Sequence, residues 1–571
     1  MFRRHPLKKK SLMTGCRNST LLLILCLLCA FPAQGKPLPA ATGEDAGVYT
    51  VPSVRIAPLE KLKTDAYGLR VPEDGAPLDG SMWENSSLAD VRQKITETQT
   101  AFFPPAAEEL RRMLLLTAAE PPRGTAEGEF LTLRLSDLFR RGDFESLREL
   151  TRKIPDARLT DEQAELFADA SLLLSDNASA CRQTVFGRES LYFQKLAVLC
   201  AALDKDENKT QLGLDLLAEQ GNADPFLHDA AEALLSNRPL TEKPAELTPS
   251  SFFLMRLFGT APSDEQLRTD EIWRLAAFAE SSNVPWVARI EAAEKLVRHG
   301  LLAPRRLEVL YEQAVLPEAP PAEGPLYRAL MYRNATAAFT GDARGENIRK
   351  ALASARQDGN FIAAARAFRE LLASLEPDSD TASVSTDIVQ ALALNGQTEN
   401  LQRWMEAARE KSPESRTQAE AWHVEDLSRP DSVRPHIPEI EKMMAFEEKS
   451  FPDAENEKQS ASAEKLVRKT DRIMLLLETL GLFAPDETWV YTSFAENGPE
   501  TTFLKSLHEK GKDGKKVLVS AGEQILDILK ELQKGYVGIL NAARRLSDMG
   551  LGDQGRLLAL EALSPDILAP E

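Results

Sequence analysis

The sequence predicts an all-α fold, a right-handed α-solenoid built from helical hairpins, with little or no strand. The chain is rich in Leu, Ala, Glu and Arg, and all four are good helix formers. From Met82 onward, apolar residues recur near the helical spacing of 3.6. Glycine and proline recur where consecutive helices would end. The best strand candidates, residues 488–494 and 515–521, are isolated, so any sheet would be minor.

The first 35 residues have the order of a secretory leader. Their charged residues are all basic, and an unbroken apolar run from Leu21 to Phe31 follows them. Small residues then occupy positions 33 (Ala33) and 35 (Gly35), and we expect cleavage after Gly35. The apolar run is shorter than the roughly 18–20 residues that a membrane-spanning helix needs. We therefore expect residues 1–35 to be a signal peptide and the mature chain to be periplasmic, with an uncleaved anchor as the alternative.

Two of the five cysteines, Cys181 and Cys200, lie outside this leader. An even number of cysteines in an oxidising compartment predicts a disulfide. A zinc site would need two further soft ligands, and the nearest histidine, His228, has no partner at ligand spacing. Two free buried thiols are one alternative, and a catalytic thiol, which pairing would remove, is the other. We expect the disulfide.

The chain is acidic. Its 87 Asp and Glu residues outnumber 69 Lys and Arg residues, which gives a formal net charge of −18. Because the leader carries only basic charges, its removal makes the remainder more acidic still. Such a chain repels nucleic acid and anionic membrane surfaces and favours basic partners. Aromatic residues make up only 6% of the chain, which is lean for a sugar-binding cleft lined by stacking rings.

Composition divides the remaining chain into four parts. Residues 36–80 are rich in proline and lack sustained periodicity, which indicates an extended linker that docks in places. Residues 81–445 carry the helical repeat pattern. Residues 446–465 are charged and poor in apolar side chains, which is typical of a second linker. Residues 466–571 form the expected C-terminal helical unit.

A recurring cadence points to repeats. In residues 138–155 and again in residues 391–413, a helix ends at Gly, apolar residues follow five and eight positions later, and Pro closes the second helix. Residues 546–565 repeat this cadence, and residues 296–317 follow it more loosely. Glycine ends helices because it tolerates positive φ, and proline cannot continue one. The cadence predicts stacked antiparallel helix pairs; a non-repeating all-α fold is the alternative, because the spacing is irregular.

This cadence resembles divergent tetratricopeptide-like (TPR-like) repeats. Four stretches are similar to a largely uncharacterised family of secreted proteobacterial α-solenoid proteins: "SMWENSSLADVRQKI", "LRRMLLLTAAEPP", "YFQKLAVLCAALDKDENKTQLGLDLLAEQG" and "RIEAAEKLVRHGLLAPRRLEVLYEQ". The resemblance covers residues 81–345 and 536–565. TPR repeats usually carry two sets of residues: a large residue, Leu, Gly and Tyr in one set, and Ala, Phe and Ala in the other. Both sets are incomplete in this chain. The resemblance implies a fold and a compartment, and it carries over no catalytic residues.

Motifs that suggest chemistry have simpler explanations. "GLGDQG" (550–555) has the glycine spacing of a dinucleotide-binding loop, but a helical stretch precedes it where that motif needs a strand. "RGD" (141–143) lies in a helix-to-helix turn of the repeat. No histidine outside the leader lies four residues from a second His or a Glu in metal-ligand order. We expect no catalytic residue, no cofactor and no metal.

Together these features predict a non-catalytic interaction scaffold or adaptor. Stacked helix pairs expose a long concave surface that suits extended peptides or other subunits. The expected partners are proteins, namely envelope-complex subunits with basic or extended segments, with no nucleic acid and no stable membrane span after cleavage. Family analogy suggests a cell-envelope machine such as the flagellar motor or a secretion complex. The alternative is a cell-wall-acting, lytic-transglycosylase-like enzyme on a helical support, which needs an acid Glu in an aromatic-rich domain.

Overall fold

The computed structural model describes residues 63–72, 76–377, 386–411, 471–480, 493–495, 498–509 and 520–564. All of them belong to one compact unit, Lys61–Glu571. The expected signal peptide, the charged linker 446–465 and most of both strand candidates lie outside the described residues.

Every regular element in the described residues is a helix, so the all-α prediction is confirmed. Two isolated β-bridges, Arg70 with Thr117 and Ser87 with Arg123, are also present. The right-handed course of a superhelix stays a prediction. The α-helices are α1 (Leu88–Thr98), α2 (Pro105–Leu116), α3 (Glu129–Arg140), α4 (Phe144–Thr151), α5 (Asp161–Leu173), α6 (Asn177–Arg182), α7 (Leu191–Leu203), α8 (Glu207–Glu219), α9 (Pro225–Ser236), α10 (Pro249–Leu257), α11 (Asp264–Leu267), α12 (Ile272–Glu280), α13 (Trp286–Arg298), α14 (Pro304–Gln313), α15 (Gly324–Ala337), α16 (Gly341–Gln357), α17 (Phe361–Ala367), α18 (Arg369–Ala373), α19 (Thr386–Leu394), α20 (Thr398–Lys411), α24 (Pro499–Glu509), α25 (Ala521–Leu532), α26 (Tyr536–Asp548) and α27 (Gly552–Ala562). Three 3-10 helices are η1 (Thr64–Ala66), η2 (Asp156–Arg158) and η3 (Gln183–Phe186).

Glycines and side-chain caps set the helix boundaries. The glycines that end helices in the predicted cadence, Gly142, Gly300, Gly396 and Gly550, all have positive φ, between 65° and 80°. At the "RGD" tripeptide, Gly142 turns the chain after α3, and the Asp143 side chain accepts a backbone N–H in the first turn of α4 at 3.2 Å. The repeat therefore accounts for this tripeptide.

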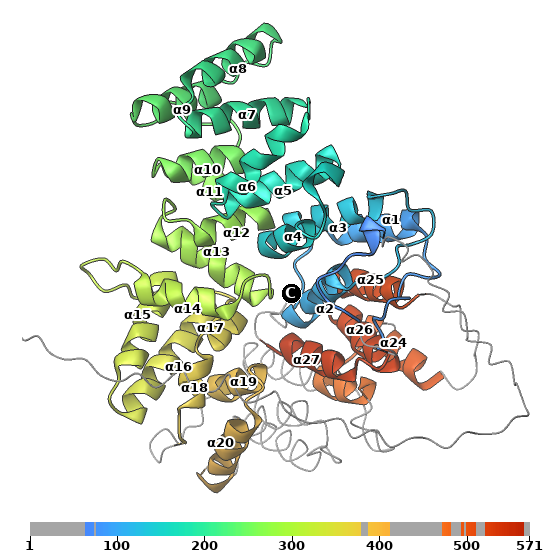
Figure 1. The fold of residues 1–571 in the computed structure, drawn as a ribbon. Coiled ribbons are helices and arrows are strands. Elements are labelled where there is room, and N and C mark those ends of the chain that lie inside the picture. The colour runs from blue at the N-terminus through green and yellow to red at the C-terminus, as the bar shows by residue number, and fades with distance from the viewer. Residues whose placement is uncertain are drawn as a thin grey trace, which may run out of the picture. The chain divides into compact units, whose positions relative to one another are not determined.

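Consecutive helices pack side by side, as in the pairs α7–α8, α12–α13, α15–α16 and α26–α27 (Figure 1). The chain also doubles back. Helices α6 to α9 form an excursion, because α10 then returns to pack on α5, and α12 packs on α3. A side chain at Gly300, which follows α13, would collide with Pro105 at the start of α2. Helices of this array therefore pack against helices that are distant in the sequence as well as against the adjacent ones.

The first and last helices of the described chain share one core. Helix α25 packs on α1 and α2, and α27 packs on α2 and α19 (Figure 1). The Trp83 side chain is 1% exposed and lies against Gly522, where a Cβ atom would come within 2.8 Å of the Trp83 ring. The Gly522 N–H also donates to the Met82 carbonyl oxygen at 2.9 Å. Only glycine permits this close approach.

Glu561 links three distant parts of the sequence. Its carboxylate, on α27, accepts the Ala106 N–H at the start of α2 at 2.8 Å. It also accepts a bond from Arg366 on α17 at 2.7 Å. Burial raises the pKa of Glu561 to about 7, and the Arg366 charge and the Ala106 N–H oppose that rise.

Residues 63–72, from the proline-rich segment, dock on α2 and α3. The Asp65 carboxylate accepts the Gly128 N–H at 2.7 Å, beside the first turn of α3, where the helix dipole favours a negative charge. Buried Arg134 donates to the Tyr67 carbonyl oxygen at 2.7 Å. Burial lowers the pKa of Arg134 to about 10, because no carboxylate bonds directly to its guanidinium. The described part of this segment is therefore held in place by buried polar contacts.

Charged pairs are buried inside the array. Three arginine–carboxylate pairs lie between helices or their ends, namely Arg111 with Asp137, Arg141 with Glu108, and Arg328 with Glu294. In the last pair, Arg328 Nε donates to Glu294 Oε1 at 2.7 Å, and the Tyr311 hydroxyl donates to the same oxygen at 2.6 Å. Buried charges persist only when such partners compensate them.

Cys181 on α6 and Cys200 on α7 are joined as a disulfide, with their Cα atoms 5.6 Å apart. The bond therefore fixes α6 against the helix that follows it. No helix in the described ranges has the combination of length and hydropathy required to cross a bilayer.

Replacing both cysteines by serine is expected to lower the free energy of unfolding by about 3 kcal/mol, because a loop of this length loses its restraint in the unfolded chain. Urea unfolding of the double variant Cys181→Ser/Cys200→Ser and of the wild type measures the effect. Wild-type protein treated with reductant is the matched control and should resemble the double variant. Two titratable thiols in denatured, unreduced protein would show that the bond does not form.

Candidate functional site

A pocket of about 540 Å³ opens between α5, α7 and the N-terminal ends of α9 and α10. These four helices meet because α7 packs on α9 and α10 returns to α5. The volume lies within the range of ligand sites. One wall is apolar and is formed by four buried side chains, Leu196, Leu199, Phe226 and Leu254.

Acidic side chains also line the pocket. Glu165 and Asp169 lie four residues apart on α5, so both carboxylates face the same side of that helix. The Tyr192 hydroxyl, from α7, donates to Asp169 Oδ1 at 2.7 Å. In the described part of the chain, neither carboxylate is paired with a Lys, Arg or His side chain. Two acidic side chains therefore line this cavity without a cationic partner in the described part of the chain.

Both carboxyl groups are hard to ionise. Burial raises the pKa of Asp169 to about 7, and the negative charge of Glu165 adds to the rise, while the bond from Tyr192 opposes it. Burial also raises the pKa of Glu165, with help from the neighbouring charges of Glu162 and Asp161. Strongly shifted carboxyl groups in a concave site are typical of functional positions.

The one basic side chain that lines the pocket is already paired. Lys195 Nζ donates to Asp224 Oδ2 at 2.8 Å. Asp224 also caps α9, because its Oδ1 accepts the Leu227 N–H at 3.1 Å. Burial opposes ionisation of Asp224, but these bonds outweigh it and lower the pKa. Exposed Glu246 adds a further negative charge to the lining, so the pocket as a whole favours a cation.

Asp169 predicts a pH dependence of stability. Its folded-state pKa of about 7 lies above its ordinary value of 3.8, so its stabilising contribution is complete below pH 3.8 and is lost as the pH rises through 7. The variant Asp169→Asn should lose this dependence while keeping the Tyr192 bond. Urea unfolding from pH 4 to pH 8 measures the difference between the variant and the wild type. Parallel curves for the two proteins would contradict the prediction.

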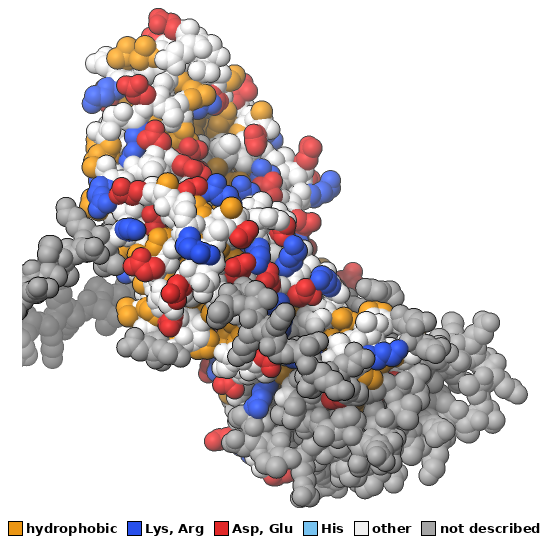
Figure 2. Space-filling view, turned by 90° about the vertical axis from the view of Figure 1, so that its right-hand side faces the viewer, with side chains coloured by type: hydrophobic (Ala, Val, Ile, Leu, Met, Phe, Trp, Pro, Cys, Tyr) orange, Lys and Arg blue, Asp and Glu red, His pale blue; other side chains and the backbone are white. Residues whose placement is uncertain are grey.

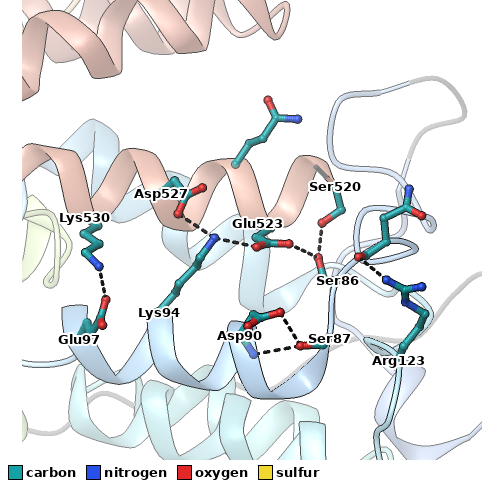
Figure 3. A network of polar contacts seen from close by, with 12 residues as sticks. Ser86, Ser87, Asp90, Lys94, Glu97, Arg123, Ser520, Glu523, Asp527 and Lys530 are labelled. Atoms are coloured by element: carbon teal, nitrogen blue, oxygen red, sulfur yellow. Dashed lines mark hydrogen bonds and ion pairs between the residues drawn. The ribbon is translucent and has the colours of Figure 1, made fainter. Parts of the chain in front are cut away.

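A second polar arrangement lies where α1 meets α25 (Figure 3). Lys94 Nζ lies 2.7 Å from Glu523 Oε1 and 2.7 Å from Asp527 Oδ1. Burial opposes the charge of Lys94, but the two carboxylates outweigh it and raise the pKa. One turn further along, Lys530 pairs with Glu97 at 2.7 Å. These pairs cross between the two ends of the described chain, so we assign this network to structure.

The motifs singled out in the sequence lie away from this pocket. Gly550 ends α26 with φ +80°, and helices flank it on both sides, as the repeat predicts. The expectation that no histidine lies at helical spacing from a Glu is wrong for His228, which is four residues before Glu232 and 3.7 Å from it. Both side chains are exposed. Buried His299 lies 2.8 Å from the Phe103 carbonyl oxygen, and burial lowers its pKa to about 4.

Metal-ligating and charged side chains are dispersed elsewhere. No group of three or more His, Cys, Asp or Glu side chains within the described ranges has the arrangement to hold a metal ion. On the face drawn in Figure 2, acidic and basic side chains are interspersed over the described surface.

Comparison with known proteins assigns no relative. No family model matches the chain, and no significant match was found among curated proteins or solved structures. The resemblance to secreted TPR-like proteins therefore stays a prediction, and the function is argued from the geometry of the site.

Proposed function

We propose that the protein is a secreted, periplasmic, non-catalytic scaffold that holds segments of cell-envelope proteins. The observation that carries this proposal is the pocket between α5, α7, α9 and α10. Helices from separate parts of the array build it, since α7 packs on α9 and α10 packs on α5, and its lining combines apolar with acidic side chains. Arrays of helix pairs typically bind partners on surfaces of this kind.

Two further features support the compartment. The basic and apolar order of residues 1–35 is typical of a secretory leader. The disulfide between Cys181 and Cys200 suits an oxidising environment, since such bonds are rare in reducing ones. The acidic net charge suits basic segments of partners in a cell-envelope machine, such as the flagellar motor or a secretion complex.

Three measurements test this function. Cell fractionation with intact-mass analysis should find the chain in the periplasm without its first 35 residues. Tagged full-length protein should capture an envelope subunit, and that subunit, when tagged in turn, should capture this protein. Purified protein incubated with peptidoglycan should release nothing. Soluble muropeptides would favour the cell-wall enzyme instead, and a cytoplasmic chain with an intact leader would contradict the compartment.

A further inference from the structure

We propose that the pocket between α5, α7, α9 and α10 binds the side chain of a lysine or arginine from an extended partner segment, an inference that rests on the proposed scaffold function. The cation would lie against Glu165 and Asp169, and its aliphatic stem would lie along the apolar wall.

Charge complementarity selects this occupant. Glu165 and Asp169 share a face of α5, and the described structure gives neither of them a cationic partner. Other carboxylates between described helices have a cationic partner, as Glu294 has Arg328 and Glu523 has Lys94. A cation from outside would supply the missing compensation, and charge-assisted hydrogen bonds in a partly desolvated site are strong.

The pocket's own lysine does not fill this role. Lys195 Nζ is engaged with Asp224 at 2.8 Å, at the start of α9. Asp169 is instead bonded to the Tyr192 hydroxyl, which donates to only one of its two carboxylate oxygens, Oδ1. The other oxygen of Asp169 and the carboxylate of Glu165 are free to accept bonds from an incoming ammonium or guanidinium group.

The apolar wall suits the rest of such a side chain. Leu196, Leu199, Phe226 and Leu254 are each less than 10% exposed and line the pocket. Lysine and arginine bury their methylene stems along surfaces of this kind while the charged head reaches polar groups. A space of about 540 Å³ exceeds the needs of a single side chain, so flanking residues of the segment have room as well.

A divalent cation fits the pocket less well. Calcium takes six to eight oxygen ligands at about 2.3–2.6 Å. The acidic side chains of the pocket lie among apolar ones, and no group with metal-binding geometry occurs among the described residues. The observations therefore favour an organic cation that carries its own apolar part.

Isothermal titration of the full-length protein tests the proposal with the peptide acetyl-Leu-Lys-Leu-amide. The matched probes replace its lysine by arginine, by norleucine, which removes the charge, and by glutamate. The lysine and arginine peptides should bind, the norleucine peptide should bind about tenfold more weakly, and the glutamate peptide should not bind. Calcium chloride alone should give no heat of binding.

The double variant Glu165→Gln/Asp169→Asn should bind the lysine and norleucine peptides equally, and weakly. Glu219→Gln, which removes an exposed carboxylate at the end of α8 outside the pocket, should behave as wild type, and thermal melts of both variants should confirm folding. Equal affinity of wild type for the lysine and norleucine peptides would overturn the proposal, as would binding of calcium without peptide. Reciprocal capture of an envelope subunit with no peptide binding would overturn this site alone. Peptide binding without any captured subunit would instead contradict the scaffold function.

Discussion

Replacing Arg328 by methionine is expected to lower the free energy of unfolding by about 3–5 kcal/mol, one of the largest effects of any single substitution in this chain. Arg328, on α15, and Glu294, on α13, are 1% and 0% exposed. Methionine keeps an unbranched apolar stem but leaves the Glu294 carboxylate buried with only the Tyr311 hydroxyl and an amide as partners. Urea unfolding followed by circular dichroism measures the change.

Two controls separate the buried charge from the lost packing. The double variant Arg328→Met/Glu294→Met should recover most of the lost stability, because it removes the stranded carboxylate. Arg349→Met removes an exposed arginine on α16, paired with Glu346, and should cost less than about 1 kcal/mol. If Arg328→Met were no more costly than Arg349→Met, the buried pair would not matter for stability.

Trp83→Ala should destabilise the protein by about 3–5 kcal/mol through the lost burial and the cavity left behind. The Trp83 ring is almost fully buried between Phe130 and Gly522, with the Phe130 ring centroid 5.6 Å away. Because the cavity opens beside α25, limited proteolysis should cut within residues 520–564 sooner than in the wild type. Phe339→Ala, which removes a fully exposed aromatic ring, is the matched control. Unchanged resistance of residues 520–564 in Trp83→Ala would contradict the shared core.

Local sequence patterns predicted where helices form, but they did not predict as well which elements pack against each helix. The stretch that contains Cys200 was expected to be helical, and it forms α7. Within it, Phe193, Leu196 and Cys200 are buried as the periodicity indicates, but Leu191 is 41% exposed. The buried side of α7 is set by α8, α9 and η3, which pack on it from different directions. The apolar periodicity of a helix marks only one face, so it cannot indicate contacts on several sides of that helix.

The candidate site depends on contacts that no local pattern reveals. Nothing in the local sequence distinguishes Glu165 and Asp169 from a solvated acidic face, because the rest of the pocket lining comes from α7, α9, α10 and the segment before α10. Their spacing of four residues was the available signal, but acidic pairs at that spacing are common in an acidic helical chain. The same reason hid the Arg328–Glu294 pair and the packing of α25 on α1.

Site-specific photo-crosslinking from the pocket tests directly whether a basic segment of a partner protein binds there. A photoreactive phenylalanine analogue at Ser250, which lines the pocket on α10, would be irradiated with envelope extract, and the crosslinked peptide would be sequenced by mass spectrometry. The same analogue at exposed Phe339 serves as the control. If the pocket binds a basic side chain, Ser250 should give one dominant adduct, to a segment that contains lysine or arginine. This adduct should be lost in the Glu165→Gln/Asp169→Asn background. Equal adducts from both positions, or an adduct that survives removal of the two carboxylates, would contradict such binding.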